Sequence, residues 1–152
     1  MSNIIKCEVT VLIAEDDDGH AELITDNLRE SGLCNDIIRF RDGQEAWDFL
    51  SEAGPGPHRI HNHPYLLLLD IRMPRVDGVE LLRRLKSHSK LHKVPVMMLT
   101  TTDDPREVEA CYKLGCNSYI TKPVDFSRFT ETLKRLGLFL SVMQVATINE
   151  DS

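Results

Sequence analysis

Apolar and polar residues follow two alternating patterns along this chain. Short, nearly continuous apolar runs, typical of buried strands, recur five times. They occupy residues 9–14, 37–40, 66–69, 96–99 and 118–121. The intervening segments have the spacing of helices that bury one side. They occupy residues 21–31, 44–51, 79–87 and 105–114, and another begins at Phe126. The pattern predicts five strands that alternate with five helices.

Residues suited to helix ends stand at several of the expected boundaries. Asp42 and Asp104 each precede a helical segment and have a glutamate three residues later, as in an N-terminal capping box. Pro105 occupies the first helical position, where a backbone N–H is not needed. Gly32 and Gly115 are suitable C-terminal stops, because glycine readily adopts the left-handed conformation found there.

The alternation predicts an α/β fold. Nearly continuous hydrophobic strands indicate a parallel sheet with helices on both faces, and right-handed crossovers leave few topologies. We expect a flavodoxin-like, doubly wound, five-stranded sheet in the order 2-1-3-4-5. Residues 53–64 (AGPGPHRIHNHP) should form a long loop. The chain is interpreted as one domain, 1–152, with its core at about 9–136 and an extended C-terminal helix or tail at 137–152.

Composition narrows the class of protein. A chain of 152 residues that is 41% hydrophobic can bury a core without disulfides. The four cysteines are scattered without CxxC spacing, which favours reduced thiols in a cytoplasmic protein. No apolar leader precedes Glu8, and the longest aliphatic run, 66–69, is too short to cross a membrane. The net charge of −6, with both signs interspersed, disfavours nucleic acid and favours a protein partner.

Polar residues stand at the carboxyl ends of the predicted strands, where open parallel sheets bind ligands. They are Glu15, Asp16 and Asp17 after the first strand, Asp70 after the third, Thr100 after the fourth and Lys122 after the fifth. Carboxylates gathered in a small space repel one another, so they must take up protons or bind a cation. The strand ends therefore predict a site for a hard cation.

Magnesium, or manganese in its place, suits this set of residues. Mg²⁺ takes one or two carboxylates directly, keeps several waters and prefers to be completed by phosphate oxygens. Asp16 and Asp70 are the expected direct ligands, and Glu15 would act through water. The backbone carbonyl of Arg72 could fill another position.

Asp70 is also a candidate nucleophile, because an aspartate can form an acyl phosphate. Phosphoryl transfer needs mainly alignment and neutralisation of the equatorial oxygens. The metal would neutralise one oxygen, the Lys122 ammonium a second, and the Thr100 hydroxyl would donate a hydrogen bond to the third. Asp17 could be a further acid at the rim or a helix cap, and His20 could affect access to the pocket.

Four segments resemble the receiver domains of two-component signalling. VLIAEDD carries the acidic pair, LLLLDIRMPRVDG the acceptor, PVMMLT the hydroxyl and YITKP the lysine. Pro74 and Gly78 also match the family's loop after the acceptor. The resemblance covers roughly residues 10–136. It implies a phosphoacceptor signalling protein, not an enzyme, with self-phosphorylation and autodephosphorylation as its only chemistry.

The resemblance implies partners and a switch. A sensor histidine kinase would phosphorylate Asp70, Thr100 and Tyr119 would move inward together, and the peptide between Lys122 and Pro123 would be cis. The altered face would involve the fourth helix, the fifth strand and the fifth helix. DDDGHAELI, the long loop before the third strand and TKPVDFSRF are most similar to single-domain regulators partnered with phytochrome-type histidine kinases.

The last helix carries more apolar surface than packing on the sheet requires. A seam with spacings of three and four is formed by Phe126, Phe129, Leu133, Leu136, Leu140 and Met143. Further apolar residues on other sides are Leu138, Phe139, Val142 and Val145. We therefore predict a homodimer through this element. The length after Pro123 leaves no room for an output domain, so output is expected through protein contact.

Other interpretations stay open. The main rival is a magnesium-dependent phosphohydrolase or phosphotransferase for a small molecule, although DIR at residues 70–72 lacks the second aspartate expected as general acid or base. Another is a pseudo-receiver that signals without phosphorylation. His58, His61 and His63 could suggest a metal site, but without cysteine or carboxylate neighbours in the sequence they are interpreted as solvated.

Overall fold

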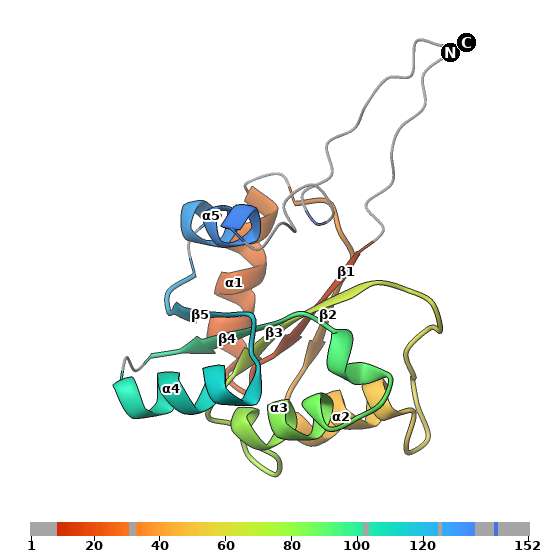
Figure 1. Ribbon diagram of the computed structural model, residues 1–152. Helices are drawn as coiled ribbons and strands as arrows, with labels where there is room; N and C mark the ends of the chain where they lie inside the picture. Colours follow the sequence, from red (N-terminus) through yellow and green to blue (C-terminus); the bar gives the residue numbers. More distant parts are fainter. Residues whose placement is uncertain (1–8, 31–32, 102–103, 125, 136–141, 143–152) are drawn as a thin grey trace, which may run out of the picture.

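The chain forms a central sheet covered by helices on both faces (Figure 1). The computed structural model describes residues 9–30, 33–101, 104–124, 126–135 and 142. The elements are β1 (Thr10–Ala14), α1 (Asp18–Glu30), β2 (Ile37–Phe40), α2 (Gly43–Ser51), β3 (Tyr65–Asp70), α3 (Gly78–Lys86), the 3₁₀ turn η1 (Leu91–Lys93), β4 (Val96–Thr100), α4 (Pro105–Leu114), β5 (Ser118–Thr121) and α5 (Phe126–Arg135).

The five strands are hydrogen-bonded in the order β2-β1-β3-β4-β5, and every neighbouring pair is parallel. This order confirms the predicted flavodoxin-like topology. β3 is central in the sheet, with Leu69 opposite Ala14 of β1 and Asp70 opposite Leu99 of β4. The register therefore brings the carboxyl ends of β1, β3 and β4 to one edge of the sheet.

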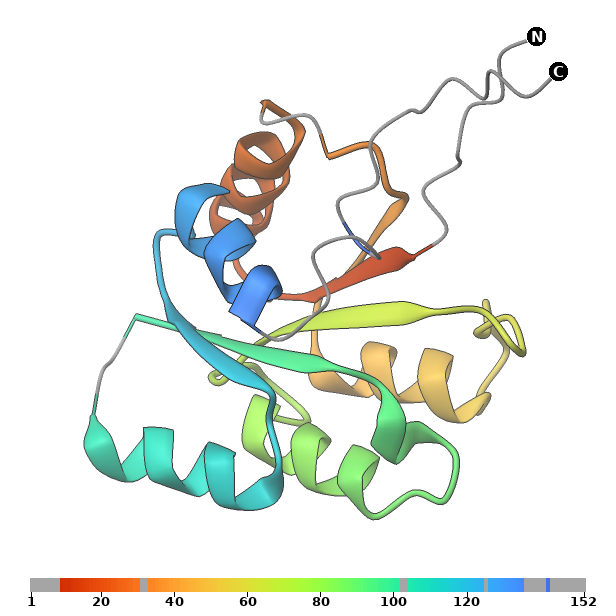
Figure 2. The same cartoon turned by 45° about the horizontal axis from the view of Figure 1, so that its top comes forward.

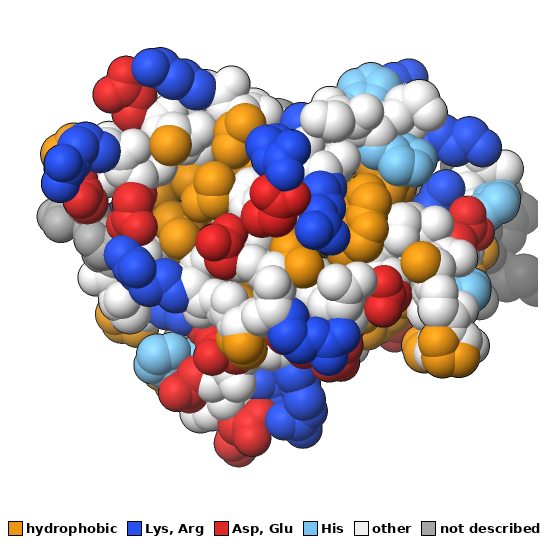
Figure 3. Space-filling model, turned by 90° about the horizontal axis from the view of Figure 1, so that it is seen from below, with side chains coloured by type: hydrophobic (Ala, Val, Ile, Leu, Met, Phe, Trp, Pro, Cys, Tyr) orange, Lys and Arg blue, Asp and Glu red, His pale blue; other side chains and the backbone are white. Residues whose placement is uncertain are grey.

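Two apolar layers hold the helices on the sheet. α2, α3 and α4 cover one face, and α1 and α5 cover the other (Figures 1 and 2). Along β1, Leu12 belongs to the cluster with α2 to α4, and its neighbours Val11 and Ile13 belong to the cluster with α1 and α5. A strand buried on both faces must be apolar throughout, which explains the continuous runs in the sequence. Lys, Arg, Asp and Glu side chains are interspersed on the outside of α2 to α4 (Figure 3).

The helix ends agree in part with the predicted caps. The Asp42 side chain accepts a hydrogen bond from the Glu45 N–H at 2.8 Å, as in a capping box. The Glu45 carboxylate, however, accepts the N–H of Arg41, whereas in a capping box it would accept the N–H of Asp42. Asp104 accepts the N–H of Arg106 at 3.0 Å, one residue earlier than expected. Gly115 ends α4 in the left-handed conformation, with φ at 102°, as predicted. Gly32 lies outside the described residues.

Residues 53–64 form the expected long loop without a helix or strand. Tyr65 and Asp70 extend β3 beyond the predicted run at both ends. α1 begins at Asp18, three residues before the predicted start, because the first turn is polar and carries no apolar signal. The structure contains no helix, among the residues that it describes, that is long and apolar enough to span a membrane.

The expectation of four reduced thiols is wrong for Cys34, which is disulfide-bonded. The scattered spacing of the cysteines gave no indication of this pair. Cys111 and Cys116 are free and buried, as expected of structural thiols.

Phe129 and Leu133 of the predicted C-terminal seam are fully buried in α5 against the sheet. The Phe126 side chain lies outside the described residues, as do Leu136, Leu140 and Met143. The homodimer and the single-domain interpretation of 1–152 stay predictions.

Candidate functional site

The candidate site lies at the edge where β1, β3, β4 and β5 end. Asp70 is the last residue of β3 and Thr100 the last of β4, while Glu15 and Lys122 follow β1 and β5 directly. All of these strands are parallel and adjacent, so their carboxyl ends converge there. Glu15, Asp70 and Thr100 are buried, with exposed fractions of 0%, 7% and 2%. The structure therefore brings together side chains that are far apart in the sequence.

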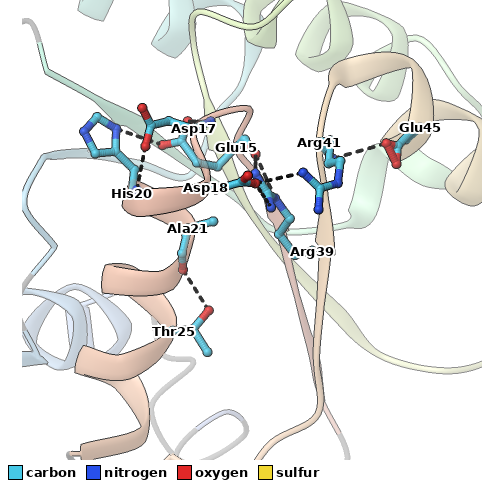
Figure 4. Close-up of polar contacts among 9 residues, drawn as sticks. All are labelled: Glu15, Asp17, Asp18, His20, Ala21, Thr25, Arg39, Arg41 and Glu45. Carbon is cyan, nitrogen blue, oxygen red and sulfur yellow. Dashed lines mark hydrogen bonds and ion pairs between the residues drawn. The ribbon is translucent and has the colours of Figure 1, made fainter.

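Glu15 is fixed by its backbone as well as by its strand. Its N–H donates to the Phe40 carbonyl at 3.1 Å, which continues the ladder between β1 and β2. The Arg39 guanidinium donates two hydrogen bonds to the Glu15 carbonyl, at 2.9 and 2.7 Å, and a third to Asp18 at 2.7 Å (Figure 4). Arg41 also donates to Asp18 at 2.8 Å. These arginines tie the loop after β1 to the edge strand β2, a contact that sequence reasoning missed.

Asp17 acts as a helix cap in this structure. Its side chain accepts the N–H of His20 at 2.9 Å in the first turn of α1 (Figure 4). This hydrogen bond lowers the pKa of Asp17 below its usual value, since it favours the carboxylate. Of the two interpretations that the sequence left open, capping is the one that the geometry supports.

Three carboxylates form a compact acidic cluster. Ligand oxygens from Glu15, Asp16 and Asp70 all lie within 4.8 Å of one another, and it is the only such group of metal-ligating side chains among the described residues. Two of these residues are buried and Asp16 is exposed. Hard oxygen donors at this spacing fit a divalent cation of the magnesium type, which carboxylates and water can share.

The Lys122 ammonium enters the cluster from β5. Its Nζ lies 3.3 Å from Asp70 Oδ2 and also contacts Glu15 Oε1 in a close ion pair. The Lys122 side chain is only 9% exposed, so this cation is held in place by the surrounding protein. The peptide between Lys122 and Pro123 is cis, as the resemblance implied.

The buried carboxylates are shifted in opposite directions. Burial, followed by the neighbouring Glu15 carboxylate, raises the pKa of Asp70 to about 7, against the opposing effect of the Lys122 ammonium. Burial, the largest single effect, would also raise the pKa of Glu15, but the hydrogen bonds to Lys122 and Asp70 and the charge of Lys122 together outweigh it, and the net pKa of Glu15 is lowered. The single Lys122 ammonium therefore does not neutralise both carboxylates. Asp70 is the carboxylate whose negative charge is left uncompensated.

His20 is a neighbour of the site that the sequence indicated only weakly. Its Nδ1 lies 3.3 Å from Lys122 Nζ and 3.6 Å from Glu15 Oε1. The side chain of His20 is 47% exposed, so the imidazole lies at the border between this contact and the solvent. The sequence could have indicated His20 more strongly, because it lies in the first turn of α1, directly after the acidic residues that follow β1.

The Arg72 side chain forms an ion pair with α4. Its guanidinium donates to Glu107 of α4 at 2.8 Å, and the side chain is 72% exposed. Asp16, Arg72 and Glu107 all line a cavity of about 430 Å³ at the mouth of the site. Through this cavity a ligand can reach Asp16, the exposed member of the acidic cluster.

The loop after Asp70 packs tightly against β3. The Gly78 N–H donates to the Ile71 carbonyl at 2.7 Å. A Cβ atom at Gly78 would lie 2.1 Å from the Asp70 carbonyl oxygen and 2.8 Å from the Ile71 Cα. Only glycine fits at this position, where α3 begins directly under the site.

Thr100 and Tyr119 occupy the positions expected of them in the sheet. Thr100 is buried, and its carbonyl accepts the Lys122 N–H at 2.7 Å, which links the ends of β4 and β5. Tyr119 is half-buried on β5 and packs against the cluster under α2 to α4.

The three histidines of the long loop do not converge on a metal site. The rings contact different groups: His58 the carbonyls of Ala53 and Gly54, His61 the Glu52 carboxylate, and His63 the Thr10 hydroxyl. His58 and His61 are exposed, as expected of solvated side chains, whereas His63 is half-buried.

Comparison with known proteins decides the family. The family model described as "Response regulator receiver domain" matches residues 11–134. The chain belongs to the receiver domain family. Among curated receivers, DivK from Brucella ovis, named a polar-differentiation response regulator, is 35% identical over 125 residues, covering 82% of this chain and 93% of DivK.

Solved structures of response regulators, including two phytochrome response regulators, are similar to this receiver. The bacteriophytochrome response regulator RtBRR is 37% identical, with a TM-score of 0.78, and the match covers 90% of this chain and 82% of RtBRR. The Mn²⁺-bound form of Rcp1 is 30% identical, with a TM-score of 0.67 and coverage of 91% and 97%. The phosphorylated cyanobacterial phytochrome response regulator RcpA is 29% identical, with a TM-score of 0.70 and coverage of 93% and 98%.

Proposed function

We propose that this receiver is a response regulator that accepts a phosphoryl group on Asp70 from the phosphohistidine of a sensor histidine kinase. The observation that carries the proposal is the cluster of Glu15, Asp16 and Asp70 with the Lys122 ammonium 3.3 Å from the Asp70 carboxylate. A nucleophile, a set of ligands for a cation and a fixed positive charge are thereby held within one pocket.

Glu15, Asp16 and Asp70 would hold Mg²⁺ or Mn²⁺, with the Arg72 backbone carbonyl as a further ligand. The carboxylate oxygens within 4.8 Å of one another fit this role, as does the excess of negative charge over the single ammonium. When bound, the cation neutralises charge on the phosphoryl oxygens and orients them. The Mn²⁺-bound form of Rcp1 supports this choice of metal.

The protein's own groups would align and stabilise the transfer. An Asp70 carboxylate oxygen attacks the phosphorus, an O–P bond forms, and the P–N bond to the donor imidazole breaks, so that the donor histidine leaves in its neutral form after taking up a proton. Lys122 is placed to neutralise a phosphoryl oxygen, and the Thr100 hydroxyl, at the end of the neighbouring strand, would hydrogen-bond another.

Tyr119 and Thr100 would transmit phosphorylation to the surface. They lie on the adjacent parallel strands β5 and β4, and Tyr119 is half-buried. The face formed by α4, β5 and α5 would change and bind the downstream protein. The proposed homodimer through the C-terminal helix region would use the continuation of α5.

The kinase partner is proposed to be of the phytochrome type. The likeness to RtBRR and RcpA over most of each chain supports this choice. A small-molecule phosphohydrolase is disfavoured because Arg72, which pairs with Glu107, stands where a second aspartate would be needed.

Phosphotransfer from a kinase tests this function. An autophosphorylated phytochrome-type histidine kinase, labelled on its histidine, is mixed with the receiver and magnesium. We expect the label to move to wild type and not to Asp70→Asn, while Asp26→Asn, a carboxylate remote from the strand ends in α1, behaves as wild type. Retention of label on the kinase would reject this type of partner, and labelling of Asp70→Asn would reject the acceptor.

A further inference from the structure

A second cavity lies at the edge of the sheet opposite Asp70. Two loops form it, residues 53–64 before β3 and residues 87–95 before β4. It measures about 450 Å³ and is lined by Arg59, His61, Asn62, Ser89, Lys90 and Lys93, none of which is acidic. Histidine, Lys and Arg side chains gather at the right-hand end of the face seen in Figure 3. The cavity is therefore positively charged, although the whole chain carries a net charge of −6.

The two lysines are the free charges of this cavity. Glu52 compensates part of the remaining charge, because its carboxylate contacts His61 and lies 3.7 Å from Arg59 Nη2. Neither Lys90 nor Lys93 forms an ion pair with any carboxylate in the part of the chain that the structure describes. Both are exposed, so an anionic ligand could reach them.

Both loops are anchored by hydrogen bonds, so the cavity has defined walls. In the first loop, the Arg59 N–H donates to the Phe49 carbonyl at 3.0 Å and its Nε to the Leu50 carbonyl at 2.9 Å. In the second loop, His88 Nδ1 accepts the N–H groups of Lys90 at 3.0 Å and Leu91 at 3.1 Å. Anchored backbones reduce the entropy that ligand binding would cost.

An apolar cavity adjoins the charged one and shares Lys90 and Lys93 with it. It measures about 360 Å³. Its apolar lining is Val9, Pro64, Tyr65, Leu66, Val94, Pro95 and Val142. A ligand that fills both cavities must therefore carry an apolar group next to negative charges.

We propose that these two cavities, here called the basic groove, bind an acidic segment of a partner protein in which carboxylates flank an apolar side chain. Charge complementarity to Lys90 and Lys93 favours such a segment, and the apolar cavity offers a pocket for its anchoring side chain. Carboxylates fit better than a phosphate group, because the one guanidinium present, Arg59, is already engaged with Leu50 and Glu52.

The basic groove is separate from the phosphorylation site. Tyr65, at its wall, and Asp70 are the two ends of β3, a strand of six residues that spans roughly 17 Å. A partner in the groove would leave the carboxyl edge free, so a kinase and this partner could bind together. The proposal does not rest on the function proposed above.

The test is fluorescence anisotropy with a fluorescein-labelled peptide in which aspartates and glutamates flank a pair of leucines. A second peptide has asparagine and glutamine at the acidic positions. We expect the acidic peptide to bind about tenfold more tightly, and the double substitution Lys90→Glu with Lys93→Glu to weaken it by about tenfold or more. The control makes the same change of charge on α4, Arg106→Glu with Lys113→Glu, and should leave the affinity within about twofold.

Each other outcome overturns the proposal. Equal affinity for the two peptides, or equal weakening in both variants, would show general attraction without a site. If the acidic peptide does not bind and the Lys90 and Lys93 substitutions change the sedimentation coefficient, a second copy of this chain occupies the groove. An unaltered melting temperature and circular dichroism spectrum of the variants establish that they fold.

Discussion

Lys122 Nζ lies 3.3 Å from Asp70 Oδ2 and at the same time contacts Glu15 Oε1. A single ammonium is thus shared by two buried carboxylates, and Asp16 adds a third from the exposed side. The negative charge left over is what a divalent cation would neutralise. Until it is neutralised, repulsion between the carboxylates lowers the stability of the folded state.

Removal of one carboxylate should stabilise the metal-free protein. We expect Asp70→Asn to raise the free energy of unfolding by about 1 kcal/mol or more at pH 8, because an amide needs no compensating charge. Wild type should gain stability when magnesium is added, and Asp70→Asn should gain much less. Urea unfolding with and without magnesium measures both effects, and an equal magnesium effect in the two proteins would contradict the proposed ligand set.

The raised pKa of Asp70 predicts a pH dependence of stability. Because the pKa is about 7 in the folded state and 3.8 for an ordinary aspartate, the folded protein binds more protons between these values. The stability of metal-free wild type relative to Asp70→Asn should therefore fall as the pH rises from about 4 to 7, by at most about 1.4 kcal/mol per pH unit, and then level off. Urea titrations across this range measure the difference, and a constant difference would show that Asp70 is not shifted.

Gly78→Ala should destabilise the protein and disturb β3. The added Cβ would lie 2.1 Å from the Asp70 carbonyl oxygen, and backbone atoms cannot move away as a flexible side chain can. We expect a loss of about 1–3 kcal/mol in unfolding free energy. Gly19→Ala is the control, since its Cβ would meet only the Asp17 side-chain oxygen, at 3.2 Å. Equal effects of the two substitutions would argue against the tight packing at Gly78.

The cysteines should react in two separate steps. Burial raises the pKa of the Cys116 thiol to about 12 and also raises that of Cys111, so neither should react with a thiol reagent in the native protein at pH 8. Denaturation without reductant should expose these two thiols, and only reduction should expose the pair that includes Cys34. Colorimetric thiol titration measures each step. Reaction of more than two thiols in unreduced, denatured protein would contradict the disulfide.

Much of this fold could be predicted because its strands are buried on both faces. The runs that became β1, β3 and β4 are continuous and apolar, and the topology rules for parallel sheets left few strand orders, of which the flavodoxin-like one was expected. The positions of Glu15, Asp70 and Lys122 followed in turn, since each residue ends or follows a strand.

Contacts between side chains from different elements could not be predicted in the same way. The hydrogen bonds from Arg39 to the Glu15 carbonyl depend on the register of β1 and β2, which no local pattern encodes. The pairing of Arg72 with Glu107 depends on how α4 packs beside the loop after β3. The start of α1 at Asp18 was missed because its first turn is polar.

The most direct test of the central claim is phosphorylation of Asp70 without any kinase. Wild type, Asp70→Asn and Asp26→Asn are incubated with acetyl phosphate and magnesium, and their intact masses are compared. We predict a single phosphoryl adduct that is stable in acid and labile in base, present in wild type and Asp26→Asn, absent in Asp70→Asn, and lost when a chelator removes the metal. An adduct that persists in Asp70→Asn, or no adduct in wild type while a control receiver becomes labelled, would contradict the assignment of Asp70 as the phosphoacceptor.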